Sequence, residues 1–249
     1  MLRVFAHRGW PRAEPENTMA SFRAAAEAGC DGIELDVQLS ADGRLVVIHD
    51  ESVDRTTDGS GQVRDLTLAE LRRLDAGAGF ARARGGPADP SARHAMPTLE
   101  EYLDFARGLD LVTDIELKNY LFEYPGLEER TIAAVRERGM EERVILSSFN
   151  HQSMALCRRL APEIDAAFIT GNWMIEAGDY CERHGARYFK PRFGYLTPAN
   201  LAELEAHGVR AMAWTVDEAS EAARLEAGGA WALITNDCAG ILAALGRKR

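Results

Sequence analysis

Seven ionisable side chains that could do chemistry lie within or directly after short apolar runs of the sequence. They are His7, Arg8, Glu34, Asp36, His49, Glu116 and Lys118. Carboxylates are the ligands that hard divalent cations prefer, imidazole exchanges protons near neutral pH, and guanidinium and ammonium groups bind phosphate. Together these groups could form a metal-assisted site for an anionic substrate, provided that the fold brings them to one place.

The spacing of the carboxylates is informative because side chains alternate between the two faces of a strand. Glu34 and Asp36 therefore share one face of an apolar run. Glu116 and Lys118 share one face of another run. Charged groups on the inward face of buried strands are costly unless they are paired or bind a cation. We expect the three carboxylates to ligate one divalent cation, Mg²⁺ or Ca²⁺; the alternative is a set of salt bridges with Arg8 and Lys118.

Two of the histidines fall beside these charged groups, namely His7 and His49. One histidine can act as general base and a second as general acid in the same reaction. The other four histidines lie in expected loops and helices, and we assign no role to His94, His151, His184 and His207.

Short aliphatic runs alternate with alanine- and glutamate-rich stretches along the chain, a pattern typical of βα units on a parallel sheet. Eight strands are expected, at residues 3–7, 32–39, 111–118, 143–149, 166–170, 187–191, 210–216 and 231–235. These elements predict a closed (β/α)₈ barrel, a TIM barrel, whose functional side chains lie at the carboxyl ends of its strands. The seven ionisable groups would then converge at one mouth.

The run RLVVIHD at 44–50 is a ninth strand-like segment that does not fit this count. The Asp-Gly turn before it predicts a hairpin that returns the chain antiparallel, so we expect an arm across the mouth that carries His49. Residues 51–97 are the least regular part and are expected to form a small insertion after the second strand and its hairpin arm. With no linker to divide the chain, residues 1–249 are expected to form a single domain, the usual size of one barrel.

The bulk composition limits the partners of the protein. A net charge of −10 argues against nucleic acid and anionic membranes but allows a small anionic substrate. Four scattered cysteines without a CxxC pair indicate reduced thiols and a cytoplasmic location. No secretory signal and no apolar run of membrane-spanning length are present, so we expect no stable membrane insertion, and nothing indicates an oligomer.

The balance of charges at the expected mouth limits the class of substrate that the site could bind. Arg8 and Lys118 would attract an anion, whereas the three carboxylates would repel it. A bound divalent cation removes this conflict and leaves a site that suits a singly charged phosphodiester.

The sequence resembles the glycerophosphodiester phosphodiesterase family. The resemblance runs over nearly the whole chain and depends on five motifs in order, HRG (7–9), PENT (15–18), ELDV (34–37), HD (49–50) and ELK (116–118). It implies a (β/α)₈ barrel with an insertion after the second strand, and metal-dependent hydrolysis of glycerophosphodiesters to sn-glycerol 3-phosphate and an alcohol.

The resemblance also implies roles for single residues. His7 and His49 would be the catalytic acid–base pair, with Arg8 and Lys118 on the phosphate. The metal ligands would be Glu34, Asp36 and Glu116, while Glu16 and Asn17 would brace the mouth. Family members often carry Asn after WTV and Asp after the Thr near the last strand. This chain has Asp217 and Asn236 there, which we expect to bear on the glycerol side and on substrate choice.

Several aromatic residues are further candidates. Trp214 is expected to pack against the glycerol part of the substrate, although a core position is nearly as compatible with its place on the seventh strand. Tyr120, Phe122 and Tyr124 could form a wall for an alcohol head group or simply pack their loop onto the barrel. Asp114 shares the inward face of Glu116 and is interpreted as structural.

Three alternative functions use the same residues differently. A lysophospholipase D acting on acylated substrates would need an apolar patch beside the mouth, for which residues 120–124 are the only indication. A catalytically silent phosphate-binding barrel would be favoured by the loss of a histidine or carboxylate, and none is missing. An enolase-type barrel would not explain the HRG and PENT motifs.

Overall fold

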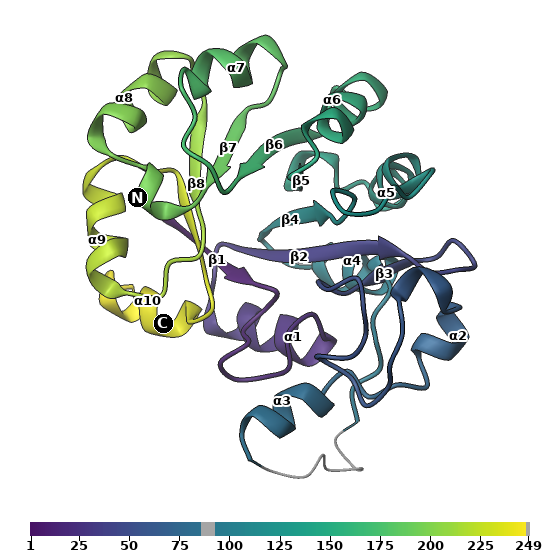
Figure 1. Cartoon of the computed structure of the whole chain (residues 1–249). Helices are drawn as coiled ribbons and strands as arrows, with labels where there is room; N and C mark the ends of the chain where they lie inside the picture. Colours follow the sequence, from purple (N-terminus) through teal and green to yellow (C-terminus); the bar gives the residue numbers. More distant parts are fainter. Residues whose placement is uncertain (86–92, 248–249) are drawn as a thin grey trace.

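A computed structural model of the chain describes residues 1–85 and 93–247. Eight parallel strands form a closed barrel with helices around it (Figure 1). In chain order the strands are β1 (Arg3–His7), β2 (Gly32–Leu39), β4 (Val112–Leu117), β5 (Val144–Ser148), β6 (Asp165–Thr170), β7 (Tyr188–Pro191), β8 (Arg210–Ala213) and β9 (Ala232–Thr235). The ring closes because β1 pairs with both β2 and β9. The predicted (β/α)₈ barrel is therefore confirmed.

Helices follow the strands and lie on the outside of the barrel (Figure 1). They are α1 (Met19–Ala28), α4 (Leu99–Ala106), α5 (Leu127–Arg136), α6 (His151–Leu160), α7 (Ala177–Arg183), α8 (Pro198–Ala206), α9 (Ala219–Ala227) and α10 (Cys238–Ala244), with short 3₁₀ turns at Glu141–Arg143 and Phe193–Tyr195. Several helices begin with a side chain that caps the first turn, as Thr98 does for α4 and Asn150 for α6. None of the described helices is both long and apolar enough to cross a membrane.

The two faces of the strands pack into separate cores, as the alternation of the sequence predicts. The outward side chains of β2 and β4 lie in the main core between strands and helices, and include Ile33, Leu35, Val37, Ile115 and Leu117. The inward side chains form a smaller apolar cluster inside the barrel, which contains Phe5, Ile145, Ala167, Tyr188, Met212, Ala232 and Ile234. The charged inward residues are nearer the carboxyl ends of the strands.

The expected hairpin is present. β3 (Leu45–Val47) pairs antiparallel with the end of β2, with Val37 opposite Val47. The Ile48 amide donates to the Asp36 carbonyl at 3.0 Å, which brings the following His49 to the mouth.

The insertion that follows contains a 3₁₀ turn (Val63–Asp65), α2 (Leu68–Leu71) and α3 (Ala78–Ala83), the last in the lower part of Figure 1. It packs on a small apolar cluster of its own, made of Val46, Ile48, Val53, Val63, Leu71 and Met96. This cluster ties the insertion to the hairpin, so the insertion supports the arm that carries His49.

The seventh barrel strand, β8, is shorter than the sequence predicts. We expected it to span 210–216, but β8 ends at Ala213. Beyond that point Trp214 keeps an isolated parallel bridge to Arg192, through bonds to the Pro191 carbonyl and from the Phe193 amide, and Val216 bonds to the Ile234 carbonyl. The continuous strand therefore stops before Trp214, whose side chain lines the pocket at the mouth.

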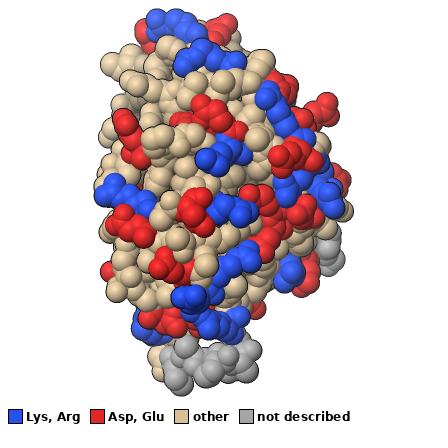
Figure 2. Space-filling model, turned by 90° about the vertical axis from the view of Figure 1, so that its right-hand side faces the viewer, with Lys and Arg blue, Asp and Glu red and all other residues tan. Residues whose placement is uncertain are grey.

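Charged side chains cover much of the surface. Figure 2 shows acidic and basic groups interspersed on the face that it displays. The cysteines all lie in the described part of the chain and are buried with free thiols, at positions 30, 157, 181 and 238.

Candidate active site

The structure brings the predicted residues together at the carboxyl ends of the strands. A pocket of about 210 Å³ is lined by His7, Arg8, Glu34, His49, Glu116, Lys118 and Trp214, together with Tyr120, Phe149, Ile169, Lys190, Thr215 and Ile234. Asp36 is buried and pairs with two of the lining residues. One site therefore collects side chains from both ends and the middle of the chain.

The three predicted metal ligands form a compact carboxylate cluster. One oxygen from each of Glu34, Asp36 and Glu116 lies within 4.8 Å of the others, and all three side chains are buried. Oδ1 of Asp36 has no hydrogen-bond partner among the residues that the structure describes. A buried oxygen of this kind is costly unless another ligand completes it. The donor set and the unfilled oxygen both fit a hard divalent cation.

Salt bridges, which were the alternative interpretation, exist beside this cluster. The Lys118 Nζ is 2.8 Å from Glu116 Oε1 and 3.7 Å from Asp36 Oδ1. The Arg8 Nε is 3.4 Å from Asp36 Oδ2. The carboxylate cluster and the salt bridges are thus present together.

A count of formal charges shows that the salt bridges leave the cluster negative. The inward carboxylates are Glu34, Asp36, Asp114 and Glu116, and the cations that pair with them are Arg8, Lys118 and Lys190. With all four carboxylates ionised, four negative and three positive charges leave one negative charge in excess. Burial and the neighbouring carboxylates raise the pKa of Glu34, although Lys190 opposes them. A divalent cation would turn this excess into one positive charge, which suits a phosphodiester anion.

Lys190 is a site residue that the sequence interpretation missed. Its Nζ lies 2.7 Å from Asp114 Oδ2 and 3.6 Å from Glu34 Oε1, and the side chain is almost fully buried. Asp114 also accepts a hydrogen bond from Ser147 Oγ at 2.6 Å. Two features of the sequence could have identified it. Lys190 is two residues after the inward Tyr188 on β7 and so points into the barrel, and lysine is rare in this chain.

The HRG and PENT segments fold into a tight and partly strained unit. Arg8 and Asn17 both adopt left-handed backbone conformations, with φ of 58° and 54°. Such conformations in residues other than glycine concentrate at functional sites. The Asn17 amide group holds the unit against the cluster, since Nδ2 donates to Asp36 Oδ2 at 2.9 Å. Gly9 is required, because a Cβ there would lie 2.3 Å from Ser21 Oγ.

The arm that carries His49 is held by a buried glutamine and an arginine. Nε2 of Gln38 donates to the carbonyl groups of residues 48, 49 and 50 at 2.8–3.1 Å. His49 Nδ1 is 2.6 Å from Asp50 Oδ1, and Arg55 Nε is 2.6 Å from Asp50 Oδ2. Hydrogen bonds from His49 and, against the effect of burial, from Arg55 hold the pKa of Asp50 well below its usual range. Arg55 also donates to Glu16, which links the arm to the PENT segment.

The His7 imidazole is neutral in its surroundings. Burial, with the nearby Arg8 charge, lowers the pKa of His7 to about 4. Its Nδ1 is 2.8 Å from Asn236 Oδ1, and its Nε2 is 4.0 Å from Glu34 Oε2. Asn236 and Asp217 do not line the pocket, where the sequence suggested a role beside the glycerol; instead Asn236 contacts His7 from behind.

Aromatic side chains form one wall of the pocket. Tyr120 packs on Phe149 with ring centroids 5.4 Å apart, and Phe149 meets Trp214 edge-on at 5.7 Å. Of the three aromatic residues considered at 120–124, only Tyr120 lines the pocket. Phe122 stacks on Arg64, and Tyr124 is buried with its hydroxyl on Gln38. The loop-packing interpretation therefore describes these two, whereas Phe149 is an additional wall residue.

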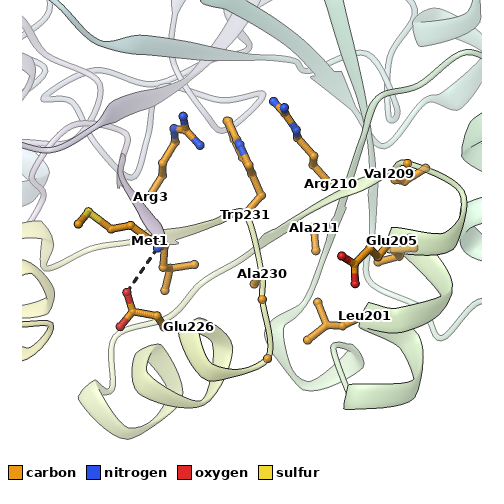
Figure 3. A pocket seen from close by; sticks show the side chains of 15 residues that line it. Met1, Arg3, Leu201, Glu205, Val209, Arg210, Ala211, Glu226, Ala230 and Trp231 are labelled. Carbon is orange, nitrogen blue, oxygen red and sulfur yellow. Dashed lines mark hydrogen bonds between the residues drawn. The ribbon is translucent and has the colours of Figure 1, made fainter.

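A second and larger hollow of about 470 Å³ lies at the opposite, amino-terminal ends of β1, β8 and β9. Figure 3 shows Trp231 between Arg3 and Arg210, whose guanidinium carbons are 4.7 and 5.6 Å from its ring. None of the predicted site residues lines this hollow. In barrels of this type the amino-terminal face serves stability, so the mouth remains the candidate site.

The fold and the mouth together define a barrel enzyme with a site for a phosphate ester. Residues 7–239 match the glycerophosphoryl diester phosphodiesterase family. The chain is 41% identical to a glycerophosphodiester phosphodiesterase of Caldanaerobacter subterraneus subsp. tengcongensis over 94% of this chain and 93% of that protein. The chain therefore belongs to the glycerophosphoryl diester phosphodiesterase family.

Solved structures agree with this assignment. An Oleispira antarctica phosphodiesterase in complex with the product sn-glycerol-3-phosphate matches with a TM-score of 0.85 and 29% identity, over 98% of this chain and 96% of that chain. A putative glycerophosphoryl diester phosphodiesterase from Silicibacter pomeroyi also matches with a TM-score of 0.85, at 26% identity over 98% of this chain and 93% of that chain.

Proposed function

We propose that this protein hydrolyses glycerophosphodiesters to sn-glycerol 3-phosphate and an alcohol, and that the reaction depends on one divalent cation, Mg²⁺ or Ca²⁺. The observation that carries the proposal is the carboxylate cluster, with one oxygen of each member within 4.8 Å of the others; two of its members line the same pocket as two histidines. The activity named for the Caldanaerobacter relative and the product in the Oleispira structure support the choice of substrate.

Glu34, Asp36 and Glu116 would hold the cation, which supplies Lewis acidity toward a phosphoryl oxygen when it is bound. Arg8 and Lys118 line the same pocket and would contact the phosphate. Both side chains are already anchored, Arg8 by Glu16 at 2.8 Å and Lys118 by Glu116 at 2.8 Å. Anchored cations need little reorganisation when charge develops in the transition state.

The two histidines differ in their partners, and this difference suggests their roles. His7 faces the amide oxygen of Asn236 with Nδ1, which leaves a lone pair on Nε2 on the pocket side. It would act as general base toward the attacking oxygen. His49 is paired with the Asp50 carboxylate and would donate the proton to the leaving alcohol oxygen. A positioned acid or base contributes about 10²–10⁴ to the rate.

The aromatic wall would receive the neutral parts of the substrate. Trp214 Nε1 donates to the Lys190 carbonyl at 2.9 Å, which fixes the ring at the pocket. We propose that Trp214 and Phe149 pack against the glycerol moiety. The four buried free thiols support a reducing, cytoplasmic location.

A lysophospholipase D remains a second candidate because the rim carries exposed apolar side chains. Tyr120 is 49% and Leu121 58% exposed in the loop after β4. Rates on lysophosphatidylcholine and glycerophosphocholine separate the two activities. If the acylated substrate is preferred and Leu121→Ser removes the preference, this second candidate is the better description.

The main proposal is tested by release of sn-glycerol 3-phosphate from glycerophosphocholine before and after chelation. We expect activity to be lost with EDTA and restored by Mg²⁺ or Ca²⁺; unchanged activity after chelation refutes the metal dependence. His7→Ala and His49→Ala should each lower kcat by about 10² or more while the circular dichroism spectrum is retained. His207→Ala is the matched control, since His207 pairs with Glu182 on the outer helices.

A further inference from the structure

The contact behind His7 involves a neutral amide, whose two ends differ in hydrogen bonding. Asn236 Oδ1 lies 2.8 Å from His7 Nδ1. An amide oxygen only accepts and an amide nitrogen only donates. The end of the Asn236 amide that faces His7 therefore decides which imidazole nitrogen carries the proton.

Asp217 determines that orientation. Its Oδ2 accepts from Asn236 Nδ2 at 2.8 Å, and its Oδ1 accepts from the Asn236 backbone amide at 2.8 Å. Thr235 Oγ1 also donates to Oδ1, at 3.0 Å. An ionised carboxylate has acceptors only, so the amide nitrogen of Asn236 must face Asp217 and its oxygen must face His7.

Asp217 is ionised in this environment. Burial opposes its charge, but the hydrogen bonds from Asn236 and Thr235 lower the pKa of Asp217 below its ordinary value. The chain of contacts runs from a carboxylate through an amide to the imidazole, and each bond has one possible direction.

We infer that Asp217 and Asn236 are positioning residues that hold His7 as the Nδ1–H tautomer and so keep the Nε2 lone pair available in the pocket. The catalytic consequence rests on the proposed role of His7 as general base. A reversed Asn236 amide would donate to Nδ1 instead. The proton would then move to Nε2 and occupy the lone pair that the base needs.

The Asp217→Asn variant tests this inference because it replaces two acceptors by one acceptor and one donor. If the oxygen of the introduced side-chain amide accepts from the Asn236 backbone N–H, its NH₂ group faces the Asn236 Nδ2 group, and two donors then oppose each other. Rotation of the Asn236 amide relieves this conflict. We expect His7 to change to the Nε2–H tautomer and kcat to fall about 10²-fold, with KM changed by less than about 3-fold.

The double variant Asp217→Asn/Asn236→Asp provides the rescue. It places an acceptor-only carboxylate directly against His7 and a donor behind it, so the Nδ1–H tautomer should return together with most of kcat. Asp237→Asn is the matched control in the same loop: Asp237 caps α10, and asparagine caps a helix equally well. It should keep the wild-type tautomer and rate.

The tautomer is read from long-range ¹H–¹⁵N NMR spectra of ¹⁵N-histidine-labelled, chelator-treated protein at about pH 8, above the ordinary histidine pKa. His7→Ala assigns the signal. Retention of the Nδ1–H tautomer in folded Asp217→Asn, or absence of rescue in the folded double variant, overturns the inference. If the tautomers change as expected and kcat does not, the inference stands and the proposed role of His7 as base falls.

Discussion

Replacement of Lys190 by methionine should destabilise the protein strongly, because it removes the cation nearest to a fully buried carboxylate. Lys190 Nζ is 2.7 Å from Asp114 Oδ2, and both side chains are at most 3% exposed. Removal of one partner from a buried ion pair leaves an uncompensated charge, which costs about 3–5 kcal/mol. With every inward carboxylate ionised, the excess negative charge of the cluster would rise from one to two.

The free energy of unfolding of the metal-free protein in urea measures this effect. The variant Lys190→Met/Asp114→Asn removes the charge as well as its partner and should recover part of the loss, giving a coupling free energy of at least about 1 kcal/mol. The matched control is Arg136→Met, which breaks an exposed pair with Glu163 and should cost less than about 1 kcal/mol.

Two results would contradict a coupled buried pair between Lys190 and Asp114. If Lys190→Met lowers the free energy of unfolding no more than Arg136→Met does, the buried pair with Asp114 does not hold the cluster together. If the double variant loses the sum of its two single losses, the two side chains are not coupled, and the distance between them carries no energetic meaning.

Three further predictions concern the mouth. Gln38→Leu leaves the carbonyl groups of residues 48–50 without their donor, so the free energy of unfolding should fall by about 2–4 kcal/mol and kcat should also fall. Tyr124→Phe, which removes only the hydroxyl that donates to Gln38, should cost about 1 kcal/mol. Equal losses for the two variants in urea titrations would contradict this prediction. Gly9→Ala would place a Cβ 2.3 Å from Ser21 Oγ on a residue with a φ of 84°. Its urea midpoint should therefore be markedly lower than that of Gly208→Ala, whose Cβ meets nothing within 4 Å and which carries only the cost of a left-handed residue, about 1–2 kcal/mol. The pKa of His7 is about 4 in the fold and 6.5 as the ordinary value, so the unfolded chain binds more protons between these values and stability falls as the pH drops through this window. Between pH 7 and pH 4 the free energy of unfolding of the metal-free protein should fall by about 3 kcal/mol more than that of its His7→Gln variant. Parallel plots of unfolding free energy against pH for the two proteins would refute the lowered pKa of His7.

The parts of the site that the sequence predicts are those that follow from local rules. Parity on a strand is local, so Glu34, Asp36 and Glu116 could be placed on the inward face before the fold was known. The Asp-Gly turn is also local, and it correctly placed His49 on an antiparallel arm. The end of β8 does not follow from local rules: the strand stops at Ala213, beyond which Trp214 keeps an isolated bridge to Arg192 and Val216 bonds to the other neighbouring strand, β9.

The residues that sequence reasoning missed depend on contacts between distant strands. Lys190 gains its meaning from Asp114, which lies across the barrel interior on β4. Asn236 meets His7 only because β9 pairs with β1, with Ala6 opposite Thr235. Neither pairing leaves a periodic signal in the chain, since the register between distant strands is set by closure of the whole ring.

Closure of the ring between β1 and β9 also has a consequence for how the barrel folds. His7 and Asn236 are 229 residues apart in the chain, yet their side chains are 2.8 Å apart. Contacts between residues so distant in sequence form slowly, because the intervening chain must first be ordered. A partly folded barrel that lacks the β1–β9 pairing can therefore hold the three carboxylates together and still lack the contact that orients His7.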